Sequence, residues 1–409
     1  MSSDNLICGL DIGTTKICAL ICQLGGDGDE KIIGVGTAPS EGLRRGVVIN
    51  LDKTVAAIER AIASAEQMAG AEVSSVYAGI AGDHIKSINS RGVIAVSRSD
   101  NEISEYDVER VIAAAKAVAI PSDREVIHIL PQEYIVDDQG GIKDPIGMSG
   151  VRLEAEVHIV TGAITSAQNI YKSIRRAGYE VNDLVLEPLA SALCVLTPDE
   201  EELGTVLIDL GGGTTDIALF TDSSIRHTSV IGLGGRNITN DIAIGLRTPA
   251  DHAEAIKIDY GAAMTSIVDP EEIISVPTVG DRPPREVSRA VLAGIIEPRA
   301  EEIFRMVLKE LKRTNFYQAV AGGVVLTGGG SLLTGVDLLA ERVFDMPVRV
   351  GIPAGFTGMS SIVSNPMYAT AFGLVRYGLD HPEKAKGEPG VFNRAFSKLE
   401  KVFNSLFNF

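Results

Sequence analysis

Two stretches of the chain place aspartate, glycine and threonine in the same order. Residues 10–20 read Leu-Asp-Ile-Gly-Thr-Thr-Lys-Ile-Cys-Ala-Leu, and residues 208–220 read Ile-Asp-Leu-Gly-Gly-Gly-Thr-Thr-Asp-Ile-Ala-Leu-Phe, with two extra glycines. Glycine has no Cβ and allows positive φ, so successive backbone N–H groups can form a concave nest for an anion, and threonine hydroxyls add donors. One copy alone would be an ordinary glycine-rich turn, but two copies in register predict two phosphate-binding loops.

The aspartate of each copy predicts a divalent cation. A carboxylate at the end of a strand repels phosphate unless a cation lies between them. Mg²⁺ usually keeps several waters when it binds to proteins. We therefore expect Asp11 and Asp209 to hold a hydrated Mg²⁺, and two facing loops to clamp a polyphosphate from both sides.

A third glycine cluster occupies residues 324–335, Val-Val-Leu-Thr-Gly-Gly-Gly-Ser-Leu-Leu-Thr-Gly, and runs into a helix-like segment. A strand, a glycine turn and a helix in this order suit close backbone approach to a flat ring or a sugar. The chain contains no G-x-x-x-x-G-K-[ST] motif and no complete G-x-G-x-x-G motif. This excludes a P-loop and argues against a Rossmann dinucleotide site.

The elements that position these loops follow from the flanking residues. Each of the first two copies lies between apolar, β-type runs, so each is predicted to be the tip of a β-hairpin. The separation of Asp11 from Asp209 indicates two related domains that open with the same hairpin. The length of 409 residues also suggests more than one domain.

Composition limits the class of protein. Charged residues at 22% and hydrophobic residues at 45% are typical of a soluble globular protein, and the net charge of -17 argues against general nucleic-acid binding. Neither the six histidines nor the four cysteines have metal-ligand spacing, and we expect buried free thiols. Without a signal-peptide pattern or an apolar run of roughly 20 residues, the expected compartment is the cytoplasm.

Together with two helical segments, 187–193 and 365–374, the three glycine motifs resemble the actin/Hsp70/sugar-kinase superfamily of ATPases. All five motifs stand in the order of that superfamily. The resemblance implies an α/β fold with two actin-like domains on RNase H-like sheets, with ATP and Mg²⁺ in the cleft between them. Three further segments, 41–62, 147–161 and 282–304, and the C-terminal tail resemble the FtsA family of bacterial cell-division proteins.

The FtsA resemblance implies an inserted subdomain over 85–162 in place of an actin subdomain. Its residues independently predict a small α+β unit, with a strand at 92–96, an amphipathic helix capped by Ser104, and strands near 125–130 and 154–160. The remaining predicted boundaries are 1–84 for the first subdomain (completed by 163–200 and 362–379), 201–247 for the large subdomain of the second half (completed by 318–361), 248–317 for its small subdomain, 380–390 for a linker and 391–409 for a terminal helix.

The superfamily resemblance also assigns roles to single residues. Glu187 stands where a polar side chain faces the water that attacks the γ-phosphate; it could equally be a helix N-terminal acid before Pro188. Glu254 and Lys257 stand where relatives contact ribose and adenine, or form an exposed i,i+3 ion pair. Lys16 is a phosphate ligand or a solvated hairpin tip. The predicted nucleotide-binding residues are Gly13, Thr14, Thr15, Lys16, Gly211, Gly212, Gly213, Thr214, Thr215, Gly234, Gly235, Glu254, Lys257, Gly328, Gly329, Gly330 and Ser331.

The tail predicts a membrane-binding helix. Five of the eleven phenylalanines lie in the last 18 residues, and four of them join Val391, Ala395, Leu399 and Leu406 in one apolar stripe at helical spacing opposite a basic face. A polar Pro/Gly linker precedes the tail, and the alternative is a helix that docks on the protein's own core. Linker, basic charge and aromatic residues together suit a helix in the headgroup layer. The predicted membrane residues are Phe392, Phe396, Leu399, Phe403, Leu406, Phe407, Arg394, Lys398 and Lys401.

The family resemblance implies partners as well. These are the C-terminal peptide of the tubulin-like GTPase FtsZ, further copies of the same chain in a filament, an anionic membrane surface and later division proteins, at the cytoplasmic face of the inner membrane. Arg285 and Arg299 are candidate contacts for the acidic peptide, or ordinary surface arginines. Two other functions stay open at this point, a small-molecule kinase of the superfamily and a pilus-assembly ATP-binding protein. The sequence leaves open whether ATP is hydrolysed at a useful rate.

Overall fold

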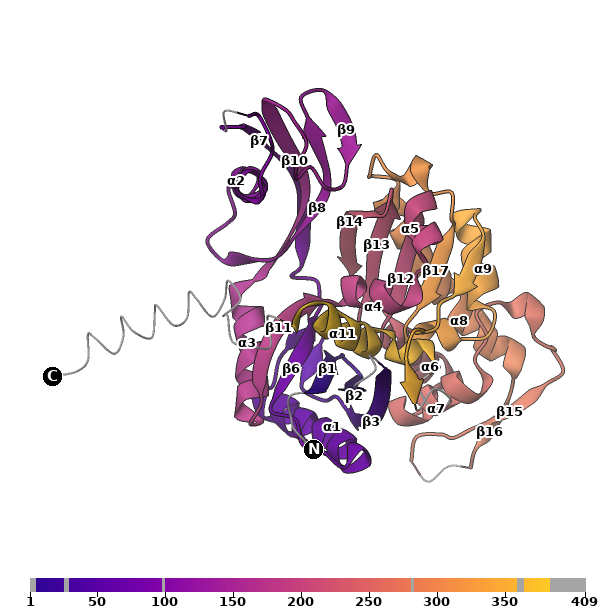
Figure 1. Cartoon of the computed structure of the whole chain (residues 1–409). Helices are drawn as coiled ribbons and strands as arrows, with labels where there is room; N and C mark the ends of the chain where they lie inside the picture. Colours follow the sequence, from indigo (N-terminus) through magenta and orange to yellow (C-terminus); the bar gives the residue numbers. More distant parts are fainter. Residues whose placement is uncertain (1–4, 26–28, 98–99, 281–282, 359–363, 383–409) are drawn as a thin grey trace.

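The computed structural model describes residues 5–25, 29–97, 100–280, 283–358 and 364–382. Figure 1 shows three bodies: a first half built on β1, β2 and β3, an inserted unit above it, and a second half built on β12, β13 and β14. The predicted linker and terminal helix lie outside the described residues from position 383 onward. Helix α11 extends to Asp380, the first residue assigned to the linker.

The first half contains a six-stranded sheet in the order β11-β6-β1-β2-β3-β19. Strands β1 and β2 form the predicted antiparallel hairpin, and β1 is parallel to β6. Helices α1 and α3 cover one face of the sheet, and α4 and α11 cover the other. The bounds are β1 Leu6–Ile12, β2 Lys16–Leu24, β3 Glu30–Pro39, β4 Leu43–Arg44, β5 Val47–Val48, α1 Leu51–Ala69, β6 Ser75–Ile80, α3 Ile164–Arg176, β11 Glu180–Leu186 and β19 Thr357–Gly358.

The second half repeats this topology. Its sheet has the order β14-β13-β12-β17-β18, and β12 and β13 form the second predicted hairpin, with β12 parallel to β17. The strand orders β3-β2-β1-β6-β11 and β14-β13-β12-β17-β18 correspond position by position. In each, three antiparallel strands are followed by two strands parallel to the third. The bounds are α5 Pro198–Leu203, β12 Thr205–Leu210, β13 Thr215–Thr221, β14 Ser224–Ile231, β17 Val324–Thr327, α9 Val336–Phe344 and β18 Val348–Val350. The duplication inferred from two sequence motifs is therefore a duplication of whole sheets.

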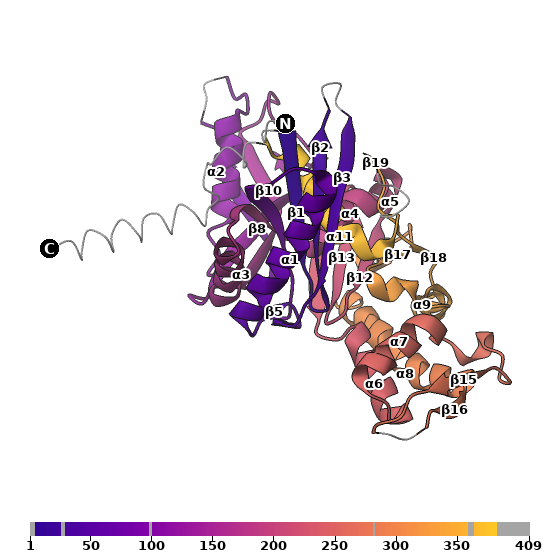
Figure 2. The same ribbon diagram turned by 90° about the horizontal axis from the view of Figure 1, so that it is seen from below.

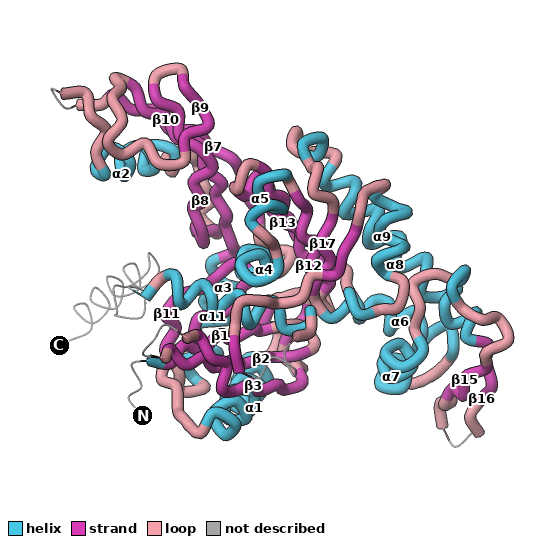
Figure 3. Tube along the Cα trace, turned by 45° about the vertical axis from the view of Figure 1, so that its right-hand side comes forward, coloured by secondary structure: helices cyan, strands magenta, loops and turns pink. Residues whose placement is uncertain are grey.

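The two remaining units are smaller. The inserted unit is a four-stranded sheet, β7-β10-β8-β9, against which α2 packs; the Asp107 carboxylate accepts from the backbone N–H of Ser104 at 3.1 Å, at the predicted helix start. The second-half small unit contains three helices and a hairpin (Figure 3). The bounds are β7 Lys86–Ala95, α2 Glu105–Ala115, β8 Arg124–Val136, β9 Gln139–Ile142, β10 Arg152–Ala163, α6 Gly235–Leu246, α7 Ala250–Tyr260, β15 Ile273–Val276, β16 Arg285–Ser288 and α8 Arg289–Leu311.

Helices α4 (Glu187–Val195) and α11 (Ala369–Asp380) join the two halves. They pack so closely that a Cβ on Gly373 would collide with the carbonyl oxygen of Ala190. One buried cluster takes Cys18 from β2, Leu207 from β12 and Phe372 from α11, so the halves share part of their core at these helices. The view from below shows α4 and α11 between the two sheets (Figure 2).

Two expectations from composition can be compared with the structure. All four cysteines are buried and unpaired, as predicted, and burial raises the pKa of the Cys18 and Cys22 thiols to about 12. Within the described ranges, no helix combines the length and the apolar character needed to cross a bilayer.

Candidate functional site

A cavity of about 400 Å³ lies between the halves. Its wall combines the β1–β2 and β12–β13 turns, the N-termini of α4 and α6, helix α7, the β17–α9 turn and the short 3₁₀ turn Pro366–Tyr368. The predicted residues that line it are Asp11, Gly13, Thr14, Thr15, Lys16, Glu187, Asp209, Gly211, Gly212, Gly213, Thr214, Gly235, Glu254, Lys257, Gly328, Gly329 and Gly330. Segments far apart in the sequence thus meet at one place.

The two glycine-threonine turns touch each other across the cavity. A Cβ on Gly213 would lie 2.6 Å from the Cγ2 and Oγ1 atoms of Thr14, and a Cβ on Gly212 would collide with the side chain of Thr15. Real Cβ atoms do not approach neighbours this closely, so both positions require glycine. The extra glycines of the second copy therefore make room for the threonines of the first.

Four carboxylates surround the base of the cavity. Asp209 accepts hydrogen bonds from Ser191 Oγ at 3.0 Å and from Thr370 Oγ1 at 3.3 Å. Burial raises the pKa of Asp209, and it raises the pKa of Asp11 to about 6 against the opposing charge of Lys16. Enclosure, then the charges of Asp11, Asp216 and Asp209, raise the pKa of Glu187 well above its usual range.

The fourth carboxylate, Asp216, is not among the predicted site residues, although it ends the second motif. Its Oδ2 accepts from Thr214 Oγ1 at 2.9 Å, whereas its buried Oδ1 has no hydrogen-bond partner within the described part of the chain. Burial, and next the charge of Asp209, raise the pKa of Asp216 to about 8. Four enclosed carboxyl groups in one cavity wall are a favourable site for a cation, which would offset their negative charge.

The donor set suits a hydrated cation better than a directly bound one. Across the described ranges, no three acidic, histidine or cysteine side chains converge as direct metal ligands. Mg²⁺ binds oxygen ligands and usually retains several waters. Carboxylates that surround a space without converging on one point fit an ion held through its water shell.

Lys16 is anchored at the cavity wall. Its Nζ donates to the carbonyl oxygen of Met367 at 2.7 Å and lies 4.5 Å from the ring centroid of Tyr368. The side chain is half-buried, so the structure does not support the alternative of a freely solvated hairpin tip.

Helices α6 and α7 supply the next part of the wall. The backbone N–H of Gly235 donates to the carbonyl oxygen of Gly211 at 2.9 Å, which ties the start of α6 to the second turn. Lys257 Nζ donates to Glu254 Oε2 at 2.8 Å and to the carbonyl oxygen of Gly235 at 3.3 Å. The i,i+3 ion pair that was one interpretation of these residues exists, and it is part of the cavity wall.

Three predicted residues, Thr215, Gly234 and Ser331, do not line the cavity but contact the backbone of the turns that do. Thr215 Oγ1 donates to the carbonyl oxygen of Leu233 at 2.9 Å, and Ser331 Oγ donates to that of Gly328 at 2.7 Å. A Cβ on Gly234 would lie 2.5 Å from the carbonyl oxygen of Gly211. Their effect is on the backbone of the turns.

Part of the cavity wall was missed by the sequence patterns. An apolar residue or a glycine within an ordinary helix or turn carries no local signal of a site. Beyond Asp216, the cavity residues outside the predicted set are Ile12, Gly46, Ala81, Arg236, Ile238, Ile258, Gly261, Leu332, Leu333, Thr334, Pro366, Met367 and Thr370. A cavity with apolar residues and a few polar groups in its wall suits a flat ring.

Comparison with known proteins identifies the family. The family described as "Cell division protein FtsA" matches residues 206–373, and "SHS2 domain inserted in FTSA" matches residues 82–161. The "Cell division protein FtsA" of Pseudomonas aeruginosa is 52% identical over 379 residues, which cover 93% of this chain and 90% of that protein. The Escherichia coli K12 relative of the same name is 43% identical, with 96% and 94% covered. The chain belongs to the FtsA family of cell-division proteins.

Solved structures with low sequence identity show the fold. The chain resembles a structure titled "PilM-PilN type IV pilus biogenesis complex" with a TM-score of 0.66 at 16% identity, covering 91% of this chain and 98% of that one. It resembles MreB5 of Spiroplasma citri bound to ADP with a TM-score of 0.56 at 14% identity, covering 95% and 100%. The actin-like fold with an inserted subdomain is thus confirmed. FtsA membership favours a cell-division role over the pilus-assembly and kinase alternatives.

The two arginines predicted to bind the FtsZ peptide are already engaged. Arg299 forms an ion pair with Asp241, with 2.6 Å between Nε and Oδ2, and a second one with Glu302. Arg285 Nη2 donates to the carbonyl oxygen of Leu246 at 2.7 Å. The charge of Arg299 is compensated by two carboxylates, whereas the exposed Arg285 donates to a neutral carbonyl group. Their partners on α6, Asp241 and Leu246, are distant in sequence and were invisible to local patterns. An acidic peptide would have to compete with Asp241 for Arg299.

Proposed function

We propose that this FtsA-family protein binds Mg²⁺-ATP in its cleft and polymerises on the inner face of the cytoplasmic membrane. There it tethers FtsZ filaments through the C-terminal amphipathic helix and recruits later division proteins. The observation that carries the ATP proposal is the meeting of two duplicated glycine-threonine turns, one from each half, above four enclosed carboxylates.

The chain's residues divide into three groups around the proposed nucleotide. The backbone N–H groups of the two turns, with Thr14, Thr214 and Lys16, would bind the phosphates, and Asp11 and Asp209 would hold Mg²⁺ through water. The Glu254–Lys257 pair would bind the ribose, and the apolar residues of the cavity wall would contact the base. Bound Mg²⁺ would offset the negative charge of the phosphates and carboxylates.

Glu187 supports a weak ATPase activity as part of the proposal. It begins α4 and lines the cavity, and enclosure raises its pKa, which makes the ionised carboxylate a stronger base toward a nearby water. Its place at a helix N-terminus, which favours negative charge, opposes part of that rise. Glu187 therefore orients and deprotonates water in the proposed reaction.

Membrane attachment rests on the sequence of residues 391–409, which lie outside the described residues. The Tyr77 hydroxyl donates to the carbonyl oxygen of His381 at 3.1 Å, so the residue that follows α11 is fixed to β6 of the first half. A single helix with partly buried phenylalanines binds reversibly, whereas many tails on one filament gain about 10²–10⁴ in apparent affinity. Filament formation and membrane attachment therefore support each other.

The proposal is tested with the full-length protein in two steps. Calorimetry should detect saturable uptake of ATP that depends on Mg²⁺. In flotation with anionic liposomes, the protein should carry the C-terminal peptide of FtsZ to the vesicles. Deletion of 391–409 should abolish flotation and leave ATP uptake intact. Failure of the folded protein to take up ATP would refute nucleotide binding, and flotation without the tail would refute the proposed anchor.

A further inference from the structure

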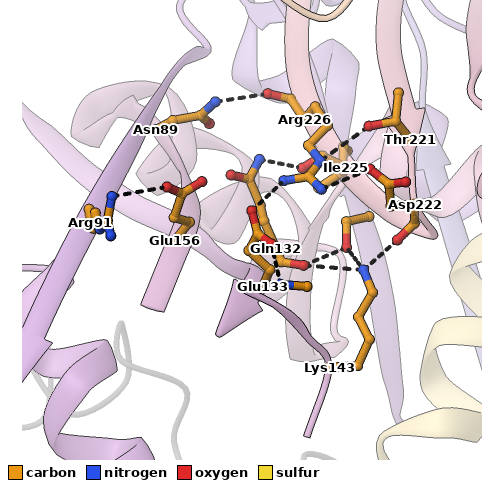
Figure 4. A network of polar contacts seen from close by, with 12 residues as sticks. Asn89, Arg91, Gln132, Glu133, Lys143, Glu156, Thr221, Asp222, Ile225 and Arg226 are labelled. Carbon is orange, nitrogen blue, oxygen red and sulfur yellow. Dashed lines mark hydrogen bonds and ion pairs between the residues drawn. The ribbon is translucent and has the colours of Figure 1, made fainter. Parts of the chain in front are cut away.

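The inserted subdomain contacts the second half along strand β14, and side chains make this contact (Figure 4). Strand β14 is an edge strand of its sheet, so its outward carbonyl groups lack a strand partner. In the described part of the chain, no backbone–backbone hydrogen bond joins the insert to β14. Side-chain donors of the insert reach β14 carbonyl oxygens at 2.8, 3.1 and 2.7 Å in the pairs Ser87–Thr228, Asn89–Arg226 and Gln132–Ile225.

A lysine holds the other end of the same contact. Lys143 Nζ, just beyond β9, donates to Ser224 Oγ at 2.6 Å, to the carbonyl oxygen of Gln132 at 3.2 Å and to that of Asp222. Ser224 Oγ in turn donates to the carbonyl oxygen of Gln132 at 2.8 Å. The hydrogen bond from the side-chain amide of Gln132 to the carbonyl oxygen of Ile225 is buried, so its loss would leave that carbonyl group unsatisfied.

Strand β14 connects this contact with the second phosphate turn. It pairs with β13 from Ser224 to Ile231, and β13 begins at Thr215, two residues after the last glycine of the turn, Gly213. Beyond β14, the carbonyl oxygen of Leu233 accepts from Thr215 Oγ1 at 2.9 Å. A displacement of β14 would therefore move the backbone that carries the second turn.

The insert itself is rooted in the first half. Its last strand, β10, continues directly into α3, and its strand β8 starts at Arg124. Arg124 Nη2 donates to the carbonyl oxygens of His84 and Thr161 at 2.9 and 2.8 Å, which fixes the base of the insert. The insert thus forms a second bridge between the halves, in addition to α4 and α11.

We propose that Gln132 and Lys143 are positioning residues for the proposed nucleotide site. Through β14 they hold the second phosphate turn against the first turn, so ATP binding and docking of the insert on β14 stabilise each other. The inference rests on the proposed ATP binding. Because coupling free energy is reciprocal, a variant that loosens the insert must weaken ATP binding by the factor with which ATP tightens the insert.

The variants separate this coupling from ordinary folding effects. Lys143→Met removes the charge and keeps an unbranched side chain, Lys143→Arg restores a cation, and Gln132→Met removes the buried donor. Exposed residues of the same subdomain provide matched controls, Lys116→Met at the end of α2 and Gln139→Met on β9. Lys143 is at the edge of the contact, so its variants test the inference even if Gln132→Met fails to fold.

The experiment combines calorimetry with hydrogen–deuterium exchange on the full-length protein, with and without Mg²⁺-ATP. In the unmodified protein, ATP should slow exchange in residues 124–143 and 224–231. Lys143→Met and Gln132→Met should abolish that effect and weaken ATP binding about fivefold or more, whereas Lys143→Arg and the two controls should retain both.

Two results overturn the inference while ATP binding stands. One is exchange in 124–143 that ATP does not change. The other is a lower melting temperature of Lys143→Met with unaltered ATP affinity, which would mark a purely structural contact. If the unmodified protein takes up no ATP in the calorimeter, the proposed function and this inference fail together.

Discussion

The two halves of the molecule have one sheet topology but opposite chemistry at their tips. After the paired threonines, the first turn continues with Lys16 and the second with Asp216. Burial raises the pKa of Asp11 and of Asp216; the charge of Lys16 opposes that rise at Asp11, whereas the charge of Asp209 adds to it at Asp216. The first turn has one glycine and the second has three, because the threonines of the first occupy the space that the glycines leave. The two halves therefore share their sheet topology, whereas their turns differ in ways that let the two fit together.

The two connecting segments differ in the same way. Each has a polar residue followed by proline, Glu187-Pro188 at the start of α4 and Asn365-Pro366 before α11. Asn365 Oδ1 accepts the backbone N–H of Met367 at 2.9 Å and serves as a cap, whereas Glu187 lines the cavity. Of these two connecting segments, the first therefore places a carboxylate in the cavity, whereas the polar residue of the second caps a turn.

The largest effect is expected from Glu187→Gln. The amide keeps the shape and hydrogen-bonding capacity of the side chain but cannot accept a proton from water, so ATP turnover should fall by about 10²–10⁴ with little change in ATP affinity. Phosphate release and calorimetry measure the two quantities. Glu254→Gln, at the other end of the cavity, should instead weaken binding. Unchanged turnover in Glu187→Gln would mean that this residue is only a helix-terminal acid.

A smaller effect is expected where the two turns interlock. Gly213→Ala places a methyl group 2.6 Å from Thr14, and overpacking strain of about 1–3 kcal/mol corresponds to ATP binding weaker by about fivefold to 150-fold. Thr14→Ser in the same molecule removes the methyl group that the new side chain meets, keeps the hydroxyl group, and should restore part of the affinity. In α8, Gly294→Ala adds the same methyl group no closer than 3.9 Å to its surroundings, and serves as the control. Equal affinities of Gly213→Ala and Gly294→Ala would show that the turns separate when ATP binds.

The sequence predicted the parts of this arrangement that depend on local pattern. The two hairpins follow from alternating apolar residues around the Gly/Thr tips, and the cap at Ser104 follows from its residue type and position. Residues that reach the cavity through the tertiary fold, such as Thr370 and Ile258, have no local pattern of their own. The pairing of Arg299 with Asp241 likewise spans two helices, so the sequence presented that arginine as an available charge.

The smallest effect is expected from Asp216, the carboxyl group of the second turn that has no counterpart in the first. It should make the stability of the ligand-free protein depend on pH. The folded pKa of about 8 for Asp216 and about 6 for Asp11 lies above the ordinary value of 3.8. The folded state therefore binds more protons than the unfolded state between pH 4 and 8, and the free energy of unfolding should fall as pH rises through this window. The slope is at most about 1.4 kcal/mol per pH unit for each proton.

Urea unfolding at pH 6, 7 and 8 without nucleotide and with EDTA measures this slope. Asp216→Asn removes the titrating group of the second turn and should flatten the slope between pH 7 and 8, where Asp11 is already ionised in the folded state. Mg²⁺ should act in the same direction, because a cation favours the ionised carboxylates and lowers their pKa. A slope that persists in Asp216→Asn would assign the excess proton to another carboxylate of the cavity, with Glu187 next in line because its pKa is also raised.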